Sequence, residues 1–482
     1  MMKSVYEMRN ISMMMDLYEL TMANGYFLTE DRDKKVVFDL FYRKNPDGGG
    51  YAIFAGLEQI LEYLEGMHFN RHNIAYLRSL NMFDEGFLQY LSDFRFTGDV
   101  YAFPEGTIMY PYEPVITVVA NIVEAQIIET ELLSEVNHQS LVATKASRIV
   151  RAADGRGVSD FGARRAHNND AAIYGARACY IGGVSGTATV AAGAYFGIPV
   201  SGTMAHSYVM YYKDELTAFR TFAKIYPDNC ILLTDTYNVL RSGVPNAIRV
   251  FQEMRDQGIH SKNYGIRLDS GDLAYLSIQA RKMLNDAGFP EAKIVVSNSL
   301  DEFTIRSILE QGARIDAFGV GERMITAKSD PVFGAVYKLS AVMEDGVFSP
   351  RIKISENIEK VTNPGLKAVY RLYDENGHSV ADLIALAGED PLAAGYVIDP
   401  EKPWKKISLE HLTARPLQKK VLENGVRTEP EENIEIVRER AAHQLAVEVW
   451  EQEKRFENPH RHYLDMTPAY YDMKMALLSE EG

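Results

Sequence analysis

Residues 264–299 carry the sequence YGIRLDSGDLAYLSIQARKMLNDAGFPEAKIVVSNS, in which an apolar run, an amphipathic stretch and a second apolar run follow one another. The two runs, YGIRL and KIVVS, are short and rich in aromatic or β-branched residues, which is typical of buried strands. The stretch between them is long enough for a helix. A strand, a helix and a second strand in this order predict a parallel β/α unit.

The same alternation continues on both sides of this unit. Further apolar runs are ILLT at 231–234 and IDAFGV at 315–320, and the amphipathic stretch VPNAIRVFQEMRDQG lies between the first of them and residue 264. Such stretches are long enough to form helices that connect two parallel strands. We therefore predict an α/β protein that contains an irregular parallel β/α barrel, and we assign residues 136–350 to this barrel domain.

The regions on either side of the barrel have other patterns. The run VVFDLF at 36–41 predicts a strand, and AGLEQILEYLEG at 55–66 places four apolar residues on one face of a helix. Between residues 100 and 119, alternating apolar residues with Gly and Pro breaks predict a small antiparallel β element. We expect an additional α+β domain at residues 1–135, and helices and loops at 351–482 that pack against it.

Length, charge and cysteine content exclude several classes of protein. A chain of 482 residues is longer than the roughly 250–300 residues that one hydrophobic core serves, so we expect more than one structural region. The net charge of −15 disfavours binding to nucleic acid or to an anionic membrane, because both carry phosphates. No window reaches the roughly 18 consecutive apolar residues of a transmembrane helix. Two cysteines, Cys179 and Cys230, are too few for a disulfide framework, so we expect a cytoplasmic protein.

Polar residues follow each predicted strand of the barrel. In parallel β/α folds the chemistry takes place at the carboxyl ends of the strands. Acidic, hydroxyl and small residues there suit a site for sugar hydroxyls, phosphates and a divalent cation. The same residues are also common helix N-caps, so each junction alone has two interpretations. The polar residues at the four strand ends are Asp235, Thr236, Asp269, Ser270, Gly271, Asp272, Asn298, Ser299, Gly321 and Glu322.

Two short loops within this set also have two interpretations. The loop Ser297-Asn298 precedes a predicted helix, whose first amides either bind a phosphate or are capped by side chains. The run Gly319-Val320-Gly321 is either a loop that a phosphate approaches closely or an ordinary tight turn. Both loops remain candidates for phosphate binding.

A cation and a histidine are further candidates. Arg267 lies two residues before Asp269, and so on the same face of its strand. It either binds a substrate carboxylate or forms an internal ion pair with Asp269. His206 occurs in SGTMAHSYVM at 201–210, where it is either a general base or nucleophile or a structural histidine.

Aromatic residues complete the candidate site. The segment SDFGARRAHNND at 159–170 contains Phe161 and Arg164, which suit stacking on a flat ring and binding of an anion, although a solvated basic turn is the alternative. Tyr18 lies in a predicted helix, where an aromatic residue is more often part of the core. The residues alone thus predict a barrel enzyme that handles phosphorylated, anionic small molecules, and they leave the reaction open.

Long segments of the chain resemble the nicotinate phosphoribosyltransferase family. They extend from position 16 to about 366. The segments are DLYELTMANGYF, FAGLEQILEYL, NHQSLVATKASRIV, SDFGARRAHNNDAA, IGGVSGTATVAAG, SGTMAHSYVM, LLTDTYNV, IRLDSGDL, VFGAVYKLSAV and PRIKISENIEKVTNPG.

The resemblance implies a reaction. Nicotinate and 5-phosphoribosyl 1-pyrophosphate give nicotinate mononucleotide and pyrophosphate, with ATP hydrolysis coupled to turnover, on the way to NAD. In this family the histidine of the GTMAHS motif, here His206, is phosphorylated by ATP. By the same resemblance Phe161 and Tyr18 stack on the pyridine ring and Arg267 binds its carboxylate.

The resemblance also implies the remaining contacts and the assembly. Asp235 and Asp269 are expected to act through Mg²⁺, which neutralises charge on the leaving pyrophosphate. The family is homodimeric with shared active sites, so Tyr18 and Phe161 are expected from the partner subunit. Glu322 departs from the family, whose members commonly have a small hydroxyl residue there, and its charge would repel a phosphate. The other residues expected at the substrates are Arg164, Thr203, Ser270, Ser297, Asn298, Gly319 and Gly321.

Three alternatives remain at this point. Enzymes of the same fold that use nicotinamide resemble this chain, but at the position of Ala188 they carry an acidic residue that accepts a hydrogen bond from the amide. Ala188 cannot accept one and therefore favours nicotinate. A barrel isomerase or aldolase acting on phosphosugars fits the strand ends, but it needs a lysine or a carboxylate base and no ATP. A protein without activity would bind nicotinate without turnover.

Overall fold

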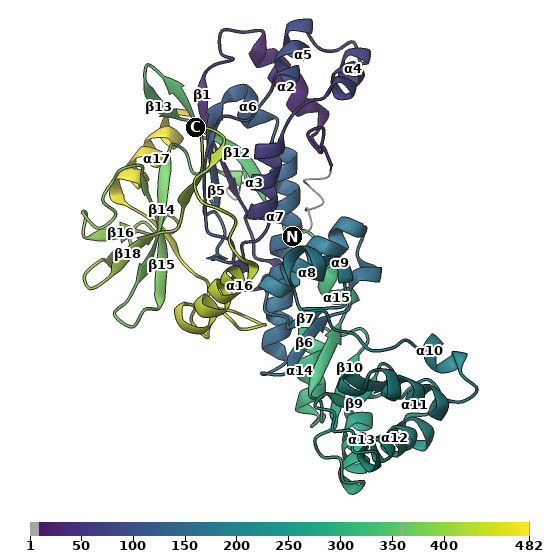
Figure 1. Ribbon diagram of the computed structural model, residues 1–482. Helices are drawn as coiled ribbons and strands as arrows, with labels where there is room; N and C mark the ends of the chain where they lie inside the picture. The colour runs from purple at the N-terminus through teal and green to yellow at the C-terminus, as the bar shows by residue number, and fades with distance from the viewer. Residues whose placement is uncertain (1–8, 358–359, 482) are drawn as a thin grey trace. The chain divides into compact units, whose positions relative to one another are not determined.

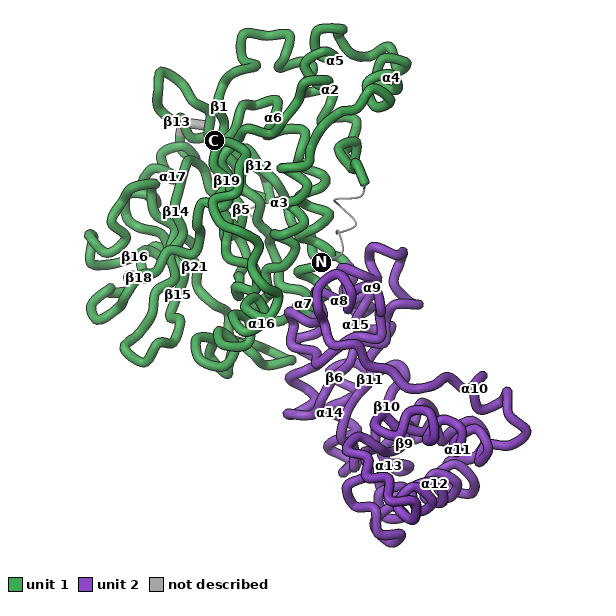
Figure 2. The backbone as a smooth tube through the Cα atoms, in the orientation of Figure 1, with its two compact units in different colours: residues 1–144, 332–482 green, residues 145–331 purple. Residues whose placement is uncertain are grey.

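The structure, a computed structural model, describes residues 9–357 and 360–481. It consists of two compact units, residues 1–144 with 332–482 and residues 145–331 (Figure 2). The chain therefore leaves the first unit once and returns to it. Across the described ranges, none of the helices has the length and apolar character needed to cross a membrane.

The second unit is built on a six-stranded parallel sheet with the order β7-β6-β11-β10-β9-β8 (Figure 1). All four predicted strands of the barrel belong to it, which confirms the parallel β/α architecture. Past β7 the sheet continues only by a bridge between Thr187 and Val200, and no described pairing joins β7 to β8. The strands are Gly157–Asp160 (β6), Gly186–Thr187 (β7), Cys230–Leu233 (β8), Tyr264–Leu268 (β9), Lys293–Ser297 (β10) and Ala317–Val320 (β11).

Helices connect these strands, and α11, α12 and α13 lie against β8, β9 and β10 (Figure 1). In α12 the apolar residues Val244, Ala247, Val250, Phe251 and Met254 recur at helical spacing and are buried. The helices are Asn169–Ile181 (α8), Val190–Phe196 (α9), His206–Tyr211 (α10), Glu215–Ile225 (α11), Val244–Asp256 (α12), Leu273–Asp286 (α13), Glu302–Glu310 (α14) and Glu322–Ile325 (α15), with shorter turns Ala163–Arg165 (η2), Pro227–Asn229 (η3) and Val239–Gly243 (η4).

The first unit contains a seven-stranded antiparallel sheet with the order β13-β12-β1-β5-β3-β19-β20. The predicted strand at 36–41 is β1, and the predicted antiparallel element at 100–119 supplies β3 and β5. Residues 336–350, which we assign to the barrel domain from the sequence, instead form β12 and β13, because β12 pairs with β1. The strands are Lys35–Phe41 (β1), Asp99–Ala102 (β3), Ile116–Asn121 (β5), Val336–Glu344 (β12), Val347–Pro350 (β13), Lys419–Glu423 (β19) and Val426–Arg427 (β20).

Helices and a small β pair complete the N-terminal part of this unit. The predicted helix at 55–66 is α3, and Leu57, Ile60, Leu61 and Leu64 are buried as its spacing predicts. The pair is Ala52–Ile53 (β2) with Ile108–Met109 (β4). The helices are Leu17–Phe27 (α2), Leu57–Gly66 (α3), Arg71–Ser79 (α4), Glu85–Ser92 (α5), Ile122–Gln126 (α6) and Glu129–Ala152 (α7), with the turn Pro46–Gly48 (η1).

The C-terminal segment forms a second sheet, of six strands, in the order β17-β16-β21-β15-β14-β18. The prediction of helices and loops at 351–482 missed these strands. Strands β14 and β15 bury the charged residues Lys367, Arg371 and Asp382, and this hides the alternation of apolar and polar residues by which strands are recognised. The strands are Lys367–Tyr373 (β14), Ser379–Leu386 (β15), Tyr396–Ile398 (β16), Lys406–Ser408 (β17), Thr413–Pro416 (β18) and Leu464–Met466 (β21); the helices are Ile434–His443 (α16) and Pro468–Glu481 (α17), with the turn Gln444–Glu448 (η6).

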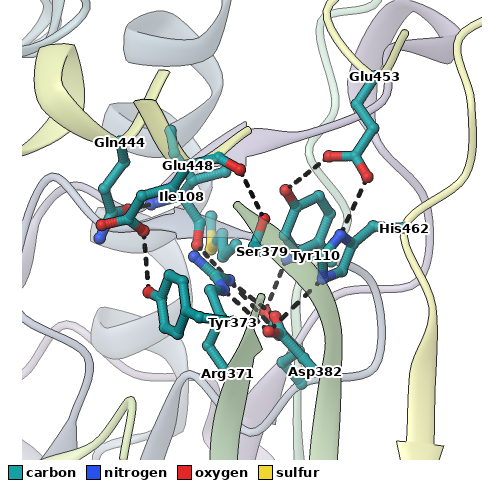
Figure 3. A network of polar contacts seen from close by, with 12 residues as sticks. Ile108, Tyr110, Arg371, Tyr373, Ser379, Asp382, Gln444, Glu448, Glu453 and His462 are labelled. Carbon is teal, nitrogen blue, oxygen red and sulfur yellow. Dashed lines mark hydrogen bonds and ion pairs between the residues drawn. The ribbon is translucent and has the colours of Figure 1, made fainter. Parts of the chain in front are cut away.

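A buried polar network surrounds Arg371 in this unit (Figure 3). The guanidinium donates to both carboxylate oxygens of Asp382, at 2.8 and 2.7 Å, and to the carbonyl of Ile108 at 2.9 Å. His462 Nε2 lies 3.5 Å from Asp382 Oδ1, and its Nδ1 lies 3.1 Å from Glu453 Oε1. The network therefore joins strand β15, the β4 segment and the C-terminal segment inside the first unit.

Candidate active site

Arg267 is the centre of a polar cluster at the carboxyl ends of β9 and β10. Its Nε donates to Ser297 Oγ at 2.8 Å, and its Nη1 donates to Thr203 Oγ1 at 3.0 Å and to the Met204 carbonyl at 3.2 Å. Its Nη2 donates to Asp269 Oδ1 at 2.8 Å, so the internal ion pair is formed. Within the described chain the second Nη2 hydrogen has no acceptor. This hydrogen remains available for an oxygen of a bound anion.

Asp269 is held in its ionised form by its neighbours. Burial raises the pKa of Asp269, but hydrogen bonds from Ser297 and Arg267 and the positive charge of Arg267 outweigh it, so the pKa lies below the ordinary value. Ser297 Oγ donates to the same oxygen, Oδ1, that Arg267 contacts. The other oxygen, Oδ2, lies 3.8 Å from His206 Nε2. Asp269 therefore links the arginine to the histidine.

His206 begins α10 and lies among two carboxylates and a hydroxyl. Its Nδ1 is 3.2 Å from Thr236 Oγ1, and its Nε2 is 3.9 Å from Asp235 Oδ1. The imidazole is 41% exposed, so a ligand can reach it. Carboxylates beside an imidazole stabilise the positive charge that develops when a ring nitrogen attacks an electrophile. The geometry therefore suits the nucleophile interpretation of this histidine.

Asp235 lies two residues after the end of β8, and its side chain is only 1% exposed. Its Oδ2 accepts hydrogen bonds from the Asp269 amide at 3.0 Å and from Ser270 Oγ at 2.6 Å. Its Oδ1 has no hydrogen-bond partner in the described parts of the chain and faces His206. A buried carboxylate oxygen without a partner is costly, and such costs are concentrated at functional sites.

Other aspartates near these strand ends are N-caps. Asp272 Oδ1 accepts from the Tyr275 amide at 3.0 Å at the start of α13, and Asp301 Oδ1 accepts from the Thr304 amide at 2.8 Å at the start of α14. The capping interpretation therefore holds for Asp272 and Asp301. Asp235 and Asp269 do not cap a helix, and they are the two acidic residues that meet His206.

The loop after β10 adopts an unusual backbone conformation. Asn298 has a φ of 103°, in a region that residues other than glycine rarely adopt, and its Oδ1 accepts from the Ser299 amide at 2.8 Å. Because Asp301 caps α14, part of the helix start is already satisfied by a side chain. A role of Ser297 and Asn298 in binding phosphate stays a prediction.

The glycines at 319 and 321 make room for Phe161. A methyl group at Gly319 would lie 2.3 Å from Cε2 of the Phe161 ring, and one at Gly321 would lie 3.0 Å from the Phe161 carbonyl oxygen. The Phe161 ring centroid is 5.5 Å from Cζ of Arg267. The geometry thus explains both glycines by packing, and a contact of these glycines with phosphate stays a prediction. An aromatic ring and a guanidinium side by side suit a flat anionic ligand.

Asp160 is a polar residue of this region that the sequence reasoning missed. It ends β6, is fully buried and accepts from the Gly162 amide at 2.8 Å and from Thr187 Oγ1 at 2.7 Å. Its carbonyl accepts from the Ala188 amide at 2.8 Å. The signal that could have found it is its position, directly before Phe161 at the end of a strand.

Three family models match the chain. The N-terminal domain of nicotinate phosphoribosyltransferase (NAPRTase) matches residues 13–137, the NAPRTase family model matches 157–371, and the C-terminal domain matches 366–474. The nicotinate phosphoribosyltransferase of Bacillus subtilis (strain 168) is 44% identical over 474 residues, which is 98% of this chain and 96% of that protein. The chain belongs to the nicotinate phosphoribosyltransferase family.

Other family members are similar over most of their length. The nicotinate phosphoribosyltransferase of Dictyostelium discoideum is 33% identical over 516 residues, covering 95% of this chain and 86% of that protein. The crystal structure of human nicotinic acid phosphoribosyltransferase superposes with a TM-score of 0.85 at 27% identity, covering 96% of this chain and all of that chain. As a member of this family the chain is a phosphoribosyltransferase enzyme, which excludes the isomerase, aldolase and inactive-protein alternatives.

Three further predicted residues of this family member have contacts of their own. Tyr18 belongs to α2 of the first unit, where burial raises its pKa and Glu129 accepts its hydrogen bond. Arg164 is exposed in the turn η2. Glu322 begins α15 and forms an ion pair with Lys328 at 2.5 Å, which partly compensates the charge that would repel a phosphate.

The carboxylates near His206 are the candidate magnesium ligands. The described residues contain no group of three or more His, Cys, Asp or Glu side chains arranged to hold a metal ion. Asp235 Oδ1 and Asp269 Oδ2 both face His206, and Asp235 Oδ1 accepts no hydrogen bond within the described ranges. Two hard oxygen ligands fit Mg²⁺, which is commonly held by one or two carboxylates together with substrate phosphates and water.

Proposed function

We propose that this enzyme joins nicotinate to 5-phosphoribosyl 1-pyrophosphate, giving nicotinate mononucleotide and pyrophosphate for NAD synthesis, and hydrolyses ATP as it does so. The single observation that carries the proposal is the Arg267 cluster, in which a guanidinium with one available hydrogen lies beside an aromatic ring and a histidine. The names of the relatives, nicotinate and nicotinic acid phosphoribosyltransferases, support the same substrates.

Nicotinate is the base that these residues suit. Phe161 stacks on the pyridine ring and Arg267 binds the carboxylate through its Nη2 side. Ala188 follows β7 and is exposed, and its methyl group offers no acceptor to an amide NH2. A bidentate grip by Arg267 would require that one of its present acceptors move away.

His206 takes the γ-phosphoryl group of ATP. A ring nitrogen forms the new bond to phosphorus, the bond from phosphorus to the β-phosphate oxygen breaks, and ADP leaves. Asp235 and Asp269 orient the ring and stabilise its positive charge. Water then hydrolyses the phosphohistidine during turnover.

The phosphorylated substrate binds along the same strand ends. In this proposal Ser270, Ser297 and Asn298 contact its ribose and phosphates, together with the loop Gly319–Gly321. Asp235 and Asp269 would hold Mg²⁺, which supplies charge neutralisation for the leaving pyrophosphate. Arg164 and Thr203 lie on the adjoining loops.

The finer architecture belongs to the same proposal. The six parallel strands form the wall of an irregular barrel, and two copies of the chain form a homodimer with shared active sites, in which Tyr18 is supplied by the partner subunit. Phe161, which the resemblance also assigns to the partner, lies beside Arg267 of its own chain and serves the site there. We place the enzyme in the cytoplasm on the basis of its two cysteines, both free and buried.

Product formation tests this function directly. Purified protein with 5-phosphoribosyl 1-pyrophosphate and Mg²⁺ is given nicotinate or nicotinamide, with and without ATP, and the mononucleotide is measured. We expect nicotinate mononucleotide that increases with ATP, and we expect His206→Ala to abolish the ATP effect while His411→Ala, at an exposed histidine of the first unit, leaves it intact. Product from nicotinamide alone would refute the choice of base, and no product from either would refute the reaction.

A further inference from the structure

The buried carboxylate of Asp160 ties together the ends of two neighbouring strands. Its Oδ1 accepts from the Gly162 amide at 2.8 Å, one residue beyond Phe161. Its Oδ2 accepts from Thr187 Oγ1 at 2.7 Å, and Thr187 is the last residue of β7. The loop that carries Phe161 is thereby joined to the loop that carries Ala188.

The backbone around Asp160 strengthens this connection. The Asp160 carbonyl accepts from the Ala188 amide at 2.8 Å, and Thr187 Oγ1 accepts from the Thr189 amide at 2.9 Å. The Phe161 amide donates to the Val320 carbonyl at 2.8 Å. Asp160 and Phe161 are therefore each fixed by a contact to a neighbouring strand or loop, and Gly162 is fixed by the Asp160 carboxylate.

The negative charge of Asp160 lacks a compensating cation among its hydrogen-bond donors. Both donors, an amide and a hydroxyl, are neutral, and the residue is fully buried. Burial of a carboxylate is costly, and a stabilising role alone would be served by an uncharged side chain. Two oxygens that both accept, in two different directions, are the feature that asparagine cannot reproduce.

We propose that Asp160 is a positioning residue that sets the placement of Phe161 relative to Ala188, and through it the binding of the pyridine base. The proposal rests on the function proposed above, because it names the residue that shapes the base subsite. Asp160 contacts no substrate itself and acts through Phe161 and Thr187.

The first test replaces one acceptor and keeps the shape. In Asp160→Asn the amide nitrogen faces Thr187 Oγ1 and can only donate to it, so the hydroxyl hydrogen loses its acceptor and the contact between the two loops is weakened. A displaced aromatic wall weakens base binding, so we expect the KM for nicotinate to rise about tenfold. The kcat and the KM for 5-phosphoribosyl 1-pyrophosphate should change less than about twofold, because the residues proposed to bind that substrate and to carry the chemistry follow other strands.

A second pair of variants approaches the same contact from Thr187. Thr187→Val removes the hydroxyl donor and should also raise the KM for nicotinate, whereas Thr187→Ser keeps the hydroxyl and should restore it. If Asp160→Asn does not yield folded protein, Thr187→Val and Thr187→Ser test the positioning role in its place. Val158→Ala, in the core of β6, lowers stability without touching either loop and serves as the control.

The outcomes separate the two proposals. A KM effect confined to nicotinate, present in Asp160→Asn and Thr187→Val and absent in Thr187→Ser and Val158→Ala, supports the positioning role. Unchanged kinetics, or a loss of kcat that Val158→Ala shares, overturns it. If the unaltered enzyme forms no nicotinate mononucleotide, the proposed function itself has failed, and direct binding of nicotinate to the same variants then tests the role of Asp160.

Discussion

Each unit of the molecule contains an arginine bound to an aspartate and beside an aromatic ring, but the two clusters are used differently. Arg371 is closed off from solvent, and the Tyr110 ring centroid lies 5.2 Å from its Cζ (Figure 3). Both oxygens of Asp382 accept from it, although its Nη1 has no hydrogen-bond partner in the described residues. Arg267 is partly exposed and keeps one hydrogen without an acceptor in the described residues. The comparison indicates that a closed network serves the fold, and that an open one can accept a ligand.

The largest effect is expected from breaking the closed network. Arg371→Met removes the guanidinium that binds both oxygens of Asp382 and leaves compensation of this buried carboxylate to His462 at 3.5 Å, so the free energy of unfolding of the first unit should fall by about 3–5 kcal/mol. Chemical denaturation followed by circular dichroism measures this, and the activity per folded molecule should remain within about twofold. A loss below about 1 kcal/mol would contradict the view that this network serves stability. The double variant Arg371→Met/Asp382→Leu should recover most of the loss.

The matched substitution in the open network should have the opposite profile. Arg267→Met removes the carboxylate-binding cation, so we expect kcat/KM for nicotinate to fall about 100-fold, or about 2.7 kcal/mol. Asp269 keeps its hydrogen bond from Ser297 and partial contact with solvent, so stability should fall by only about 1 kcal/mol. Steady-state kinetics measure kcat/KM for nicotinate, and thermal unfolding measures the loss of stability. Equal losses of stability in Arg267→Met and Arg371→Met would remove the distinction between the clusters.

The aromatic partner of Arg267 offers a smaller test. Gly319→Ala places a methyl group where the Phe161 ring now lies, so the ring must move and the KM for nicotinate should rise roughly tenfold, or about 1.4 kcal/mol. Kinetics at saturating 5-phosphoribosyl 1-pyrophosphate measure this. Gly66→Ala is the control, because a methyl group there meets no atom within 4 Å. An unchanged KM would show that the ring position does not matter to base binding.

The smallest effect is a difference in pH dependence. Burial lowers the pKa of His462, but the carboxylates of Asp382 and Glu453 outweigh it and raise the pKa above its ordinary value of about 6.5. The contribution of protonated His462 to the stability of the fold is therefore complete below about pH 6.5 and is lost as the pH rises through the raised pKa. The stability advantage over His462→Gln should be larger at pH 5.5 than at pH 8.5, by on the order of 1 kcal/mol in chemical denaturation at the two pH values.

The open network should show no such change in that window. Because the pKa of Asp269 is lowered, its contribution is present above the ordinary carboxyl value and is lost only as pH falls through the lowered pKa. An Asp269→Asn variant should therefore differ from the unaltered chain by the same amount of stability at pH 5.5 and 8.5. A difference that changed with pH would place Asp269 among the titrating groups.

The sequence predicted the parallel sheet and the open network well, for a physical reason. Strand ends in a parallel sheet meet at one edge, so Asp235, Asp269 and Ser297 could be grouped from their positions alone. The sequence could not distinguish functional aspartates from caps: Asp272 and Asp301 also follow strands, and only their hydrogen bonds to helix amides identify them as caps. The glycine pair at 319 and 321 suggested a phosphate loop, although what it accommodates in the structure is a phenyl ring.

The closed network was not predictable in the same way. Arg371 and Asp382 interrupt strands whose other residues are apolar, and charged residues in a sequence indicate an exposed face unless their partners are known. The Ile108 carbonyl that Arg371 contacts is 263 positions away, and no local pattern connects the two. Burial of a charge is decided by long-range partners, which explains why the C-terminal sheet was mistaken for helices and loops.

The return of the chain to its first unit has a consequence for its synthesis. Strand β1 pairs with β5 on one side and with β12 on the other, and the whole second unit lies between those partners in the sequence. At roughly 5–20 residues per second, a ribosome exposes β1 with one open edge for about 10–40 s before β12 emerges. An unpaired edge of this kind is a site for aggregation or for a chaperone. Slower translation of the second unit should therefore increase the dependence of the nascent chain on chaperones.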